Sequence, residues 1–193
     1  MSGVTQLHNV VYVVRYESSI IRMFTADTLS PLGDGIHVKE MKNPKDIVAC
    51  RHGRQLYVAD WFGACIWRVS ADDHSYVKWL PTEATTDICR PLSLSLVSSH
   101  LLVMSQWPCT LRQYSTTDGQ LLCDVKLPGY MNLYHAVETT RQTFIVGHHG
   151  TPQNKLQYVV SKLCVFCHVL LISATFLLTV RNLLSFSATS VCY

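Results

Sequence analysis

NPKDIVACRHGRQLYVAD, from Asn43 to Asp60, is the stretch that decides the fold, together with IWRVSADD from Ile66 to Asp73. The first stretch passes from a proline through a short apolar run, turns at Gly53 and ends in a second apolar run. The second stretch is a third apolar run that ends in an acidic turn. Short runs of β-branched and aromatic residues between Gly, Asp and Ser turns are typical of β-strands. These residues therefore predict three successive strands.

The same pattern recurs along the chain with a period close to 45 residues. Apolar runs start at Val11, Leu56, Leu101 and Thr143, and the runs that follow them start at Ile21, Ile66, Leu111 and Leu156. Turns rich in Asp, Gly, Ser and Thr come next, and a further strand is predicted after each turn, at Gly35 to Met41, Tyr76 to Leu80 and Leu121 to Leu127. An opening strand precedes every unit except the first, at Asp46 to Cys50, Leu92 to Val97 and His135 to Thr139.

Four short strands per repeat predict an all-β fold made of propeller blades. A blade is a small twisted sheet that cannot bury its faces alone and therefore stacks on its neighbours. A period near 45 fits such a unit, and the repeats contain no amphipathic stretch long enough for a helical repeat. The units cover about residues 5–42, 43–86, 87–130 and 131–162. Residues 1–162 are therefore predicted to form a partial β-propeller.

The unit that starts at Asn43 resembles an NHL repeat. That family's pattern has a proline before the first strand, a glycine turn, a Leu-Tyr-Val-Ala-Asp strand, an Ile-x-Arg-Val strand and an Asp/Gly turn. The resemblance covers about residues 5–162 and weakens outside this unit, where Arg15, Ser105 and Gly147 stand at the position of Asp60. No Trp-Asp pair closes any unit as in WD40 repeats, and no Gly-Gly pair appears as in Kelch repeats. The resemblance implies a propeller fold, with RNA binding or metal-dependent hydrolase or lyase activity known in such propellers.

The ring is predicted to be open. The first unit lacks a recognisable opening strand and the fourth lacks a closing one, so about three and a half four-stranded blades are expected. Propellers usually have four or more blades around one axis. An open arc leaves strand edges exposed, which favours pairing with another chain. Our hypothesis is a fragment or truncated isoform of a longer propeller, or an arc that closes by self-association through its open blade edges.

The C-terminal part changes abruptly in composition. Leu163 to Val180 are eighteen residues without a charge, bounded by Lys162 and Arg181. They predict an apolar C-terminal helix over 163–181, just long enough to span a bilayer, followed by a short tail over 182–193. The lysines before it favour cytosolic blades, so we expect membrane association, or a cytoplasmic protein if the helix does not insert. A buried helix or an unstructured read-through sequence are the alternatives.

Composition argues against several functions. The net charge of +3 is scattered, without the basic stripe typical of nucleic-acid binding. The eight cysteines are mostly isolated in apolar runs and are interpreted as free buried thiols, and no secretory signal peptide is recognised. Cys164, Cys167 and His168 have the spacing of a covalent haem site, which we interpret as a chance match because the segment is apolar. No cofactor is predicted.

Two pairs of aromatic residues are the first candidates for partner binding. Trp61 with Phe62, and Trp107 with Pro108, follow equivalent strands of successive units. Equivalent loops of stacked blades lie on one face, so these rings could form a continuous patch. The alternative is that they cap the blade core.

Polar residues give weaker candidates. Arg68 and Arg112 recur with Arg22 in the third strand of their units, either as a basic groove for an acidic partner or as blade-to-blade contacts. Asp60 could line the central channel, but we expect it to hydrogen-bond the next turn. His148 and His149 are adjacent in a strand and would point to opposite sides, which disfavours a shared metal ion. No catalytic or metal-binding residue is predicted.

These features predict a non-enzymatic propeller scaffold that binds a protein or peptide and is anchored by the apolar segment if that segment inserts. Nothing in the chain combines a nucleophile with its base, a phosphate-binding Gly-rich loop, or paired acids at repeated positions. The alternatives are a fragment of a metal-dependent propeller hydrolase or lyase, and an NHL-type RNA-binding module.

Overall fold

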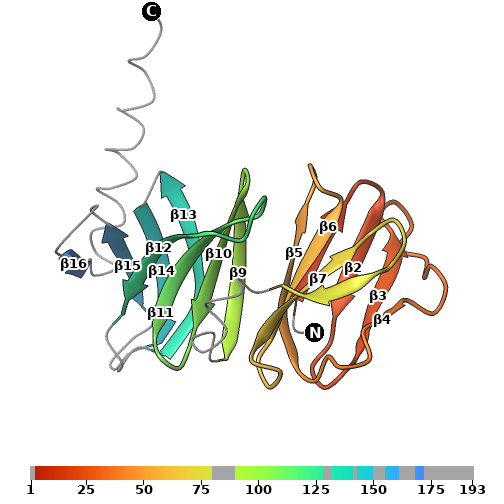
Figure 1. Cartoon of the computed structure of the whole chain (residues 1–193), viewed down its shortest axis with the longest axis horizontal. Helices are drawn as coiled ribbons and strands as arrows, with labels where there is room; N and C mark the ends of the chain where they lie inside the picture. Colours follow the sequence, from red (N-terminus) through yellow and green to blue (C-terminus); the bar gives the residue numbers. More distant parts are fainter. Residues whose placement is uncertain are drawn as a thin grey trace, which may run out of the picture.

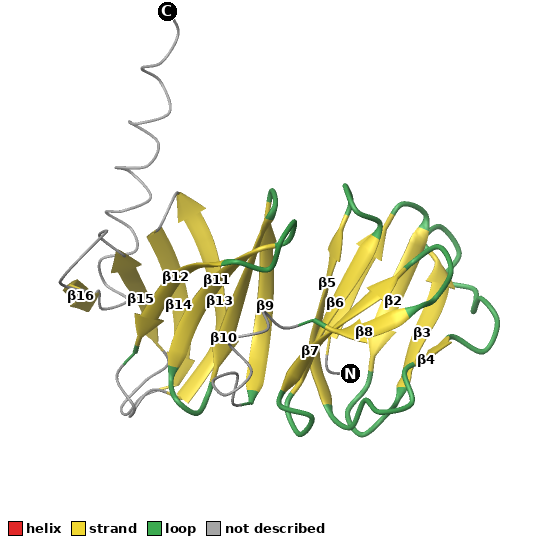
Figure 2. Cartoon of the chain, viewed as in Figure 1, coloured by secondary structure: helices red, strands yellow, loops and turns green. Residues whose placement is uncertain are grey.

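The computed structural model describes residues 3–79, 90–127, 132–140, 143–149, 155–160 and 168–171, and these form strands and loops only (Figure 2). The strands of the first two repeats are β1 (Gly3–Leu7), β2 (Val10–Val14), β3 (Ile20–Thr25), β4 (Ile36–His37), β5 (Pro44–Cys50), β6 (Gln55–Asp60), β7 (Cys65–Ser70) and β8 (Tyr76–Lys78). Those of the next two are β9 (Pro91–Val97), β10 (His100–Ser105), β11 (Thr110–Ser115), β12 (Leu121–Lys126), β13 (Asn132–Thr140), β14 (Thr143–His149), β15 (Lys155–Val160) and β16 (His168–Leu171).

Each set of four consecutive strands forms one antiparallel sheet. The order within every sheet follows the chain, as in β5-β6-β7-β8. In that sheet Ile47 pairs with Val58, and Val58 pairs in turn with Trp67. Each sheet is therefore a local four-stranded meander, as the repeat predicts.

The four sheets stand side by side in chain order (Figure 1). Their first strands pack against one another in succession, β1 on β5, β5 on β9 and β9 on β13. The approach of β1 to β5 requires Gly3, because a Cβ there would lie 2.8 Å from the backbone nitrogen of Ile47. First strands that line a common axis, with the other three strands fanning outward, are the arrangement of propeller blades.

The core lies between the sheets. In β6, Leu56 and Val58 join the cluster shared with the first sheet, whereas Tyr57 and Ala59 join the cluster shared with the third. This alternation has the two-residue period of a strand. In β10, Leu102 and Met104 likewise pack toward the fourth sheet. Because both faces of the inner sheets are buried, their second strands are almost uniformly apolar.

The all-β fold of stacked four-stranded sheets is confirmed, and two strands that the repeat did not predict complete it. β1 supplies the opening strand of the first sheet, and β16 pairs with β15 as the closing strand of the fourth. The structure therefore has four sheets where three and a half were expected. β1 was missed because its Thr5 and Gln6 are polar and only Val4 and Leu7 give it apolar character.

The predicted C-terminal helix lies mostly outside the described residues. Inside it, His168–Leu171 form strand β16, so the prediction of a helix is wrong for these four residues. They can extend because β15 offers them a free edge to pair with. Within the described part of the chain, no helix is long and apolar enough to cross a membrane.

Candidate functional site

The loops between strands divide between two faces of the molecule. The strands of each sheet alternate in direction, so the loops after second strands and the links between sheets lie on one face, here called the link face. Among the described residues it carries the loops and links 15–19, 38–43, 61–64 and 106–109. The opposite face carries the remaining loops, 8–9, 26–35, 51–54, 71–75, 98–99 and 116–120.

Trp61 and Phe62 stand together on the link face, in the turn between β6 and β7. Their ring centroids are 4.8 Å apart, and Phe62 is 55% exposed. The backbone nitrogen of Trp61 donates to the carbonyl of Asn43, which ties the turn to the preceding link. The structure therefore places this predicted pair at the surface and does not use Phe62 as a cap on the core.

Two cations join these rings to the neighbouring sheets. The Nζ atom of Lys45 lies 5.3 Å from the ring centroid of Trp61 and 4.5 Å from that of Tyr16. The guanidinium of Arg90 lies 4.9 Å from the Trp61 ring. All three distances are within the range of cation–π attraction. Tyr16, Lys45, Trp61, Phe62 and Arg90 thus form a continuous group across three sheets, which we call the aromatic–cation row.

Trp107 occupies the equivalent loop of the third sheet. It is 57% exposed, and the backbone nitrogen of the preceding Gln106 donates to the carbonyl of Arg90. Arg90 therefore connects the two loops, with its backbone at the Trp107 loop and its guanidinium over Trp61. Sequence reasoning found both aromatic loops but missed Tyr16, Lys45 and Arg90, whose roles depend on contacts between sheets.

The recurring arginines do not gather into one groove. Arg112 is only 7% exposed, and its Nε atom lies 3.3 Å from Oδ1 of Asp124 on the neighbouring strand. Arg68 is half-buried and lines a groove beside β7 and β8, whereas Arg22 is exposed on the first sheet. None of these three arginines lies on the link face, and none belongs to the aromatic–cation row.

Asp60 organises the turn that displays Trp61 and Phe62. Its buried carboxylate accepts hydrogen bonds from the backbone nitrogens of Lys42, Asn43 and Gly63 and from Nε1 of Trp67, at 2.8–3.1 Å. The expected bond to the next turn is thus confirmed. Asp60 lies in a second strand and away from the axis, so it does not line the channel. A Cβ on Gly63 would lie 2.3 Å from Oδ2 of Asp60, which explains the glycine in this turn.

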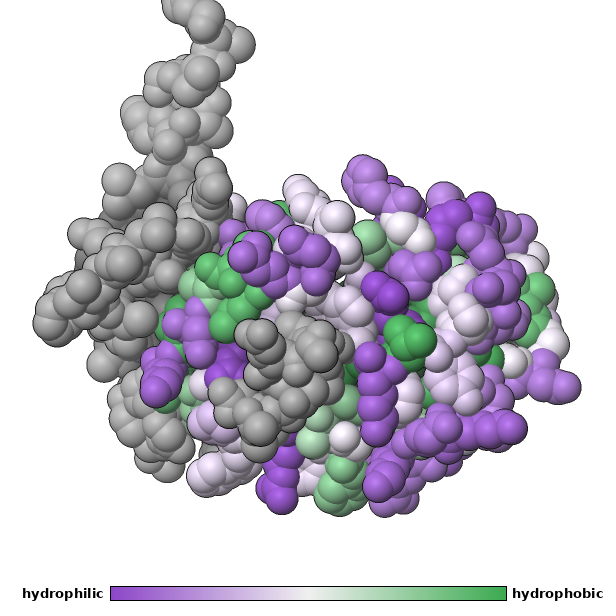
Figure 3. Space-filling view, viewed as in Figure 1, coloured by the Kyte–Doolittle hydropathy of each residue, from purple (hydrophilic) through white to green (hydrophobic). Residues whose placement is uncertain are grey.

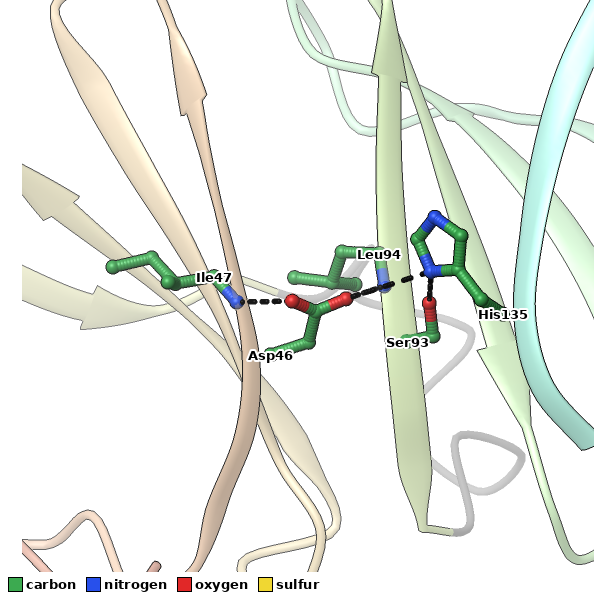
Figure 4. Close-up of polar contacts among 5 residues, drawn as sticks. All are labelled: Asp46, Ile47, Ser93, Leu94 and His135. Carbon is green, nitrogen blue, oxygen red and sulfur yellow. Dashed lines mark hydrogen bonds and ion pairs between the residues drawn. The ribbon is translucent and has the colours of Figure 1, made fainter. Parts of the chain in front are cut away.

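A polar group lines the axis instead, at matching positions of the first strands (Figure 4). Oδ1 of Asp46 accepts from the nitrogen of Ile47 and Oδ2 accepts from that of Leu94, across the boundary between the second and third sheets. Oδ2 also lies 3.9 Å from Nδ1 of His135, which shares a short hydrogen bond with the hydroxyl of Ser93. Sequence reasoning missed this group because its members are more than forty residues apart.

Burial raises the pKa of Asp46 above its ordinary 3.8, against the opposing effect of its hydrogen bonds and of His135. Asp46 and Ser93 both approach Nδ1 of His135. A serine nucleophile and its orienting acid need different ring nitrogens of the histidine between them. This geometry therefore ties three sheets together and is not that of a catalytic triad.

The described thiols are unlinked, and the described residues offer no metal site. Cys50, Cys65, Cys109 and Cys123 form no disulfide. Burial and the nearby Asp60 carboxylate raise the pKa of Cys65 to about 12, so its thiol stays protonated at neutral pH. The described residues contain no group of three or more His, Cys, Asp or Glu side chains placed to hold a metal ion. His148 is buried in β14; the Cys164 and Cys167 pair lies outside the described residues.

Comparison with known proteins supports the fold. No family model and no curated protein matches the chain. Among solved structures, a hydrazine synthase of Kuenenia stuttgartiensis matches with a TM-score of 0.67 at 12% identity, over 88% of this chain and 49% of that one. The Cps50 (Swd1) β-propeller domain of Myceliophteria thermophila gives 0.61 at 8%, over 87% and 56%. A chain of a nidogen/laminin complex gives 0.61 at 13%, over 81% and 59%.

The chain thus spans about half the length of these structures. At such identities the likeness concerns the fold alone. The resemblance to NHL repeats stays a prediction, and the chain has the fold of a partial β-propeller of stacked four-stranded sheets.

Proposed function

We propose that this chain is a non-enzymatic β-propeller scaffold that binds a protein or peptide through its link face. The observation that carries the proposal is the aromatic–cation row, in which exposed rings are held in place by neighbouring side chains. Tyr16 is 47% exposed and Phe62 is 55% exposed, and Trp107 adds a third exposed ring in the next loop. Large exposed aromatic residues at fixed positions are characteristic of the centres of protein interfaces.

The rigidity of these positions favours binding. Asp60 fixes the turn that carries Phe62, and the Trp61 ring is contacted by Lys45 of its own sheet and by Arg90 at the start of the next sheet. A surface that is ordered before binding loses less conformational entropy when the partner arrives. Membrane anchoring through Leu163 to Val180 and a cytosolic location of the blades stay predictions.

Peptide selection tests the proposal. We would select random twelve-residue peptides on the full chain and measure the affinity of enriched peptides by fluorescence anisotropy. The double variant Phe62→Ser, Trp107→Ser should weaken binding at least about tenfold, because truncating an aromatic residue at an interface hot spot costs about 2 kcal/mol or more.

A matched control removes exposed apolar side chains from the other face. Leu29, in the loop 26–35, is 63% exposed, and Leu121, at the start of β12, is 41% exposed. Leu29→Ser, Leu121→Ser should leave the affinity unchanged within about twofold. Failure to enrich any peptide, or equal affinity for the Phe62→Ser, Trp107→Ser variant, would contradict the proposal.

A further inference from the structure

The two faces of the molecule carry opposite charges. Among the described residues, the loops and strand ends of the link face carry seven Lys and Arg side chains against two exposed Glu side chains. The cations are Arg15, Lys39, Lys42, Lys45, Lys78, Arg90 and Lys126, and the acids are Glu17 and Glu40. The loops of the opposite face carry five Asp side chains, Asp27, Asp34, Asp72, Asp73 and Asp118, against Arg51 and Arg54.

The remaining acidic groups near the link face do not cancel this excess at the surface. Asp60 is fully buried, and its oxygens already accept four N–H donors. Asp46 lies along the axis, with both oxygens accepting backbone N–H groups. On the opposite face, hydrogen bonds from Ser70 and Ser75 hold the pKa of Asp73 at about 2, so this carboxylate stays charged well into the acid range. The net charge of +3 hides this separation because the two faces partly cancel.

The cations lie among the exposed rings. Lys45 lies between Tyr16 and Trp61, and Arg90 lies over Trp61 beside the loop of Trp107. An occupant of this surface would therefore meet ammonium and guanidinium groups within a few ångströms of apolar contact area. Hydrogen bonds between such groups and carboxylates are among the stronger ones in proteins.

From this placement we infer that the link face binds an acidic peptide segment, whose carboxylates meet Lys45 and Arg90 while its apolar side chains meet Phe62 and Trp107. This inference rests on the proposed function and adds the chemistry of the partner. At Trp61 a single-stranded nucleic acid is disfavoured, because bases stack on open ring faces. In the aromatic–cation row, Lys45 and Arg90 already lie over the Trp61 ring.

The test compares labelled twelve-residue probes on the full chain. The first is three repeats of Glu-Leu-Glu-Phe, the second has Gln in place of every Glu, and the third is an oligouridylate. In 50 mM salt the Glu peptide should bind at least about tenfold more tightly than the Gln peptide, and the ratio should shrink in 500 mM salt because salt screens exposed charges.

Two charge variants locate the effect. Lys45→Gln, Arg90→Gln should weaken binding of the Glu peptide at least about fivefold and leave the Gln peptide unchanged, because the lost contacts are charge-assisted. Arg51→Gln, Arg54→Gln removes the same charge from the opposite face and should have little effect. Urea unfolding of each variant shows that it is folded.

The outcomes separate the two proposals. If the Glu and Gln peptides bind equally, and both are weakened by Phe62→Ser, Trp107→Ser, the acidic preference is wrong while peptide binding stands. If the Glu peptide does not bind, the inference of an acidic partner is also wrong. The proposed function is then decided by whether Phe62→Ser, Trp107→Ser weakens binding of the selected peptides. If the oligouridylate binds more tightly than the Glu peptide and is weakened by Lys45→Gln, Arg90→Gln, the face binds RNA instead.

Discussion

The carboxylate of Asp60 determines the local structure of the link face. It accepts one hydrogen bond from the turn at Gly63, two from the link at Lys42 and Asn43, and one from Trp67 inside the sheet. One side chain thereby fixes the turn, the link and a core ring relative to one another. Ser105 occupies the equivalent position in the third sheet, where it is also buried.

The contact between Asp60 and Gly63 can be measured with a double-mutant cycle. Gly63→Ala should lower the free energy of unfolding by about 1–3 kcal/mol, because the new Cβ would overlap Oδ2 of Asp60. In an Asp60→Ser background the same change should cost at least about 1 kcal/mol less, since the shorter side chain leaves room. Urea unfolding measures all four proteins.

Gly53→Ala is the control for the cycle. Its Cβ would meet only the flexible side chain of Gln55, at 3.3 Å, so the free energy of unfolding should change by less than about 0.5 kcal/mol. Equal costs of Gly63→Ala in the two backgrounds would show that Asp60 does not fill the space beside Gly63.

Asp46 should make the stability depend on pH in the acid range. Because burial raises its pKa above 3.8 in the folded state, the folded chain keeps this proton to higher pH than the unfolded chain does. The contribution of Asp46 to the free energy of unfolding should therefore fall as pH rises through and above 3.8. In Asp46→Asn this contribution is absent.

Urea unfolding of both proteins between about pH 3.5 and 6 isolates this contribution, since the remaining groups cancel in the difference. The wild type should lose stability relative to Asp46→Asn as pH rises. A relative gain would mean that the hydrogen bonds and His135 outweigh burial and hold the pKa of Asp46 below 3.8.

At the scale of elements, each sheet is stabilised by its contacts with the next. Trp79 lies in the link after β8, where its backbone nitrogen donates to the carbonyl of Ile66. Its ring meets Tyr57 of the second sheet at 5.0 Å and Tyr114 of the third at 5.9 Å, both edge to face. The link therefore inserts a large aromatic ring between two blades.

Removing this ring should weaken the packing between the second and third sheets. Trp79 is 7% exposed, and Trp79→Ala should lower the free energy of unfolding by about 3–5 kcal/mol, the usual cost of truncating a buried tryptophan. Trp107→Ala, at 57% exposure, should cost less than about 0.5 kcal/mol. Chemical denaturation monitored by far-ultraviolet circular dichroism checks both, and similar costs for the two would contradict this role of Trp79.

The elements that the sequence predicted are those whose signals are local. Second and third strands repeat as apolar runs because both of their faces are buried, and the bond from Asp60 to its turn spans only three residues. β1 was not predicted because it is short and half polar. β16 was not predicted because its apolar residues belong to a long uncharged run that is typical of a helix.

The candidate site was only partly predictable for a related reason. Trp61, Phe62 and Trp107 follow recognisable strands, so their shared face could be deduced from the repeat. Lys45 reaches Tyr16 of the preceding sheet and Arg90 reaches Trp61 from the start of the next sheet, and a single sequence does not give the distance between residues on different sheets. The same holds for the contact of Asp46 with His135, which spans three sheets.

At the scale of the whole molecule, the stacking of the four described sheets gathers exposed aromatic and basic side chains on the link face. In the view of Figure 3, hydrophilic residues gather over the sheets β1–β4 and β5–β8, with small hydrophobic patches among them. Among the described residues, the loops and strand ends of the link face carry most of the exposed Lys and Arg and the aromatic–cation row, whereas the charged residues of the opposite loops are mostly Asp. A partner that binds this surface would span several blades.

The central claim is that a partner binds at the link face. Hydrogen exchange measured by mass spectrometry, with and without a selected peptide, tests this claim most directly. Binding should slow amide exchange in the link-face loops 15–19, 38–43, 61–64 and 106–109 and leave the loops 51–54, 71–75 and 116–120 unchanged. Slowed exchange in those opposite loops, with none at 61–64 or 106–109, would show that the partner binds elsewhere and that the link face is not the binding site.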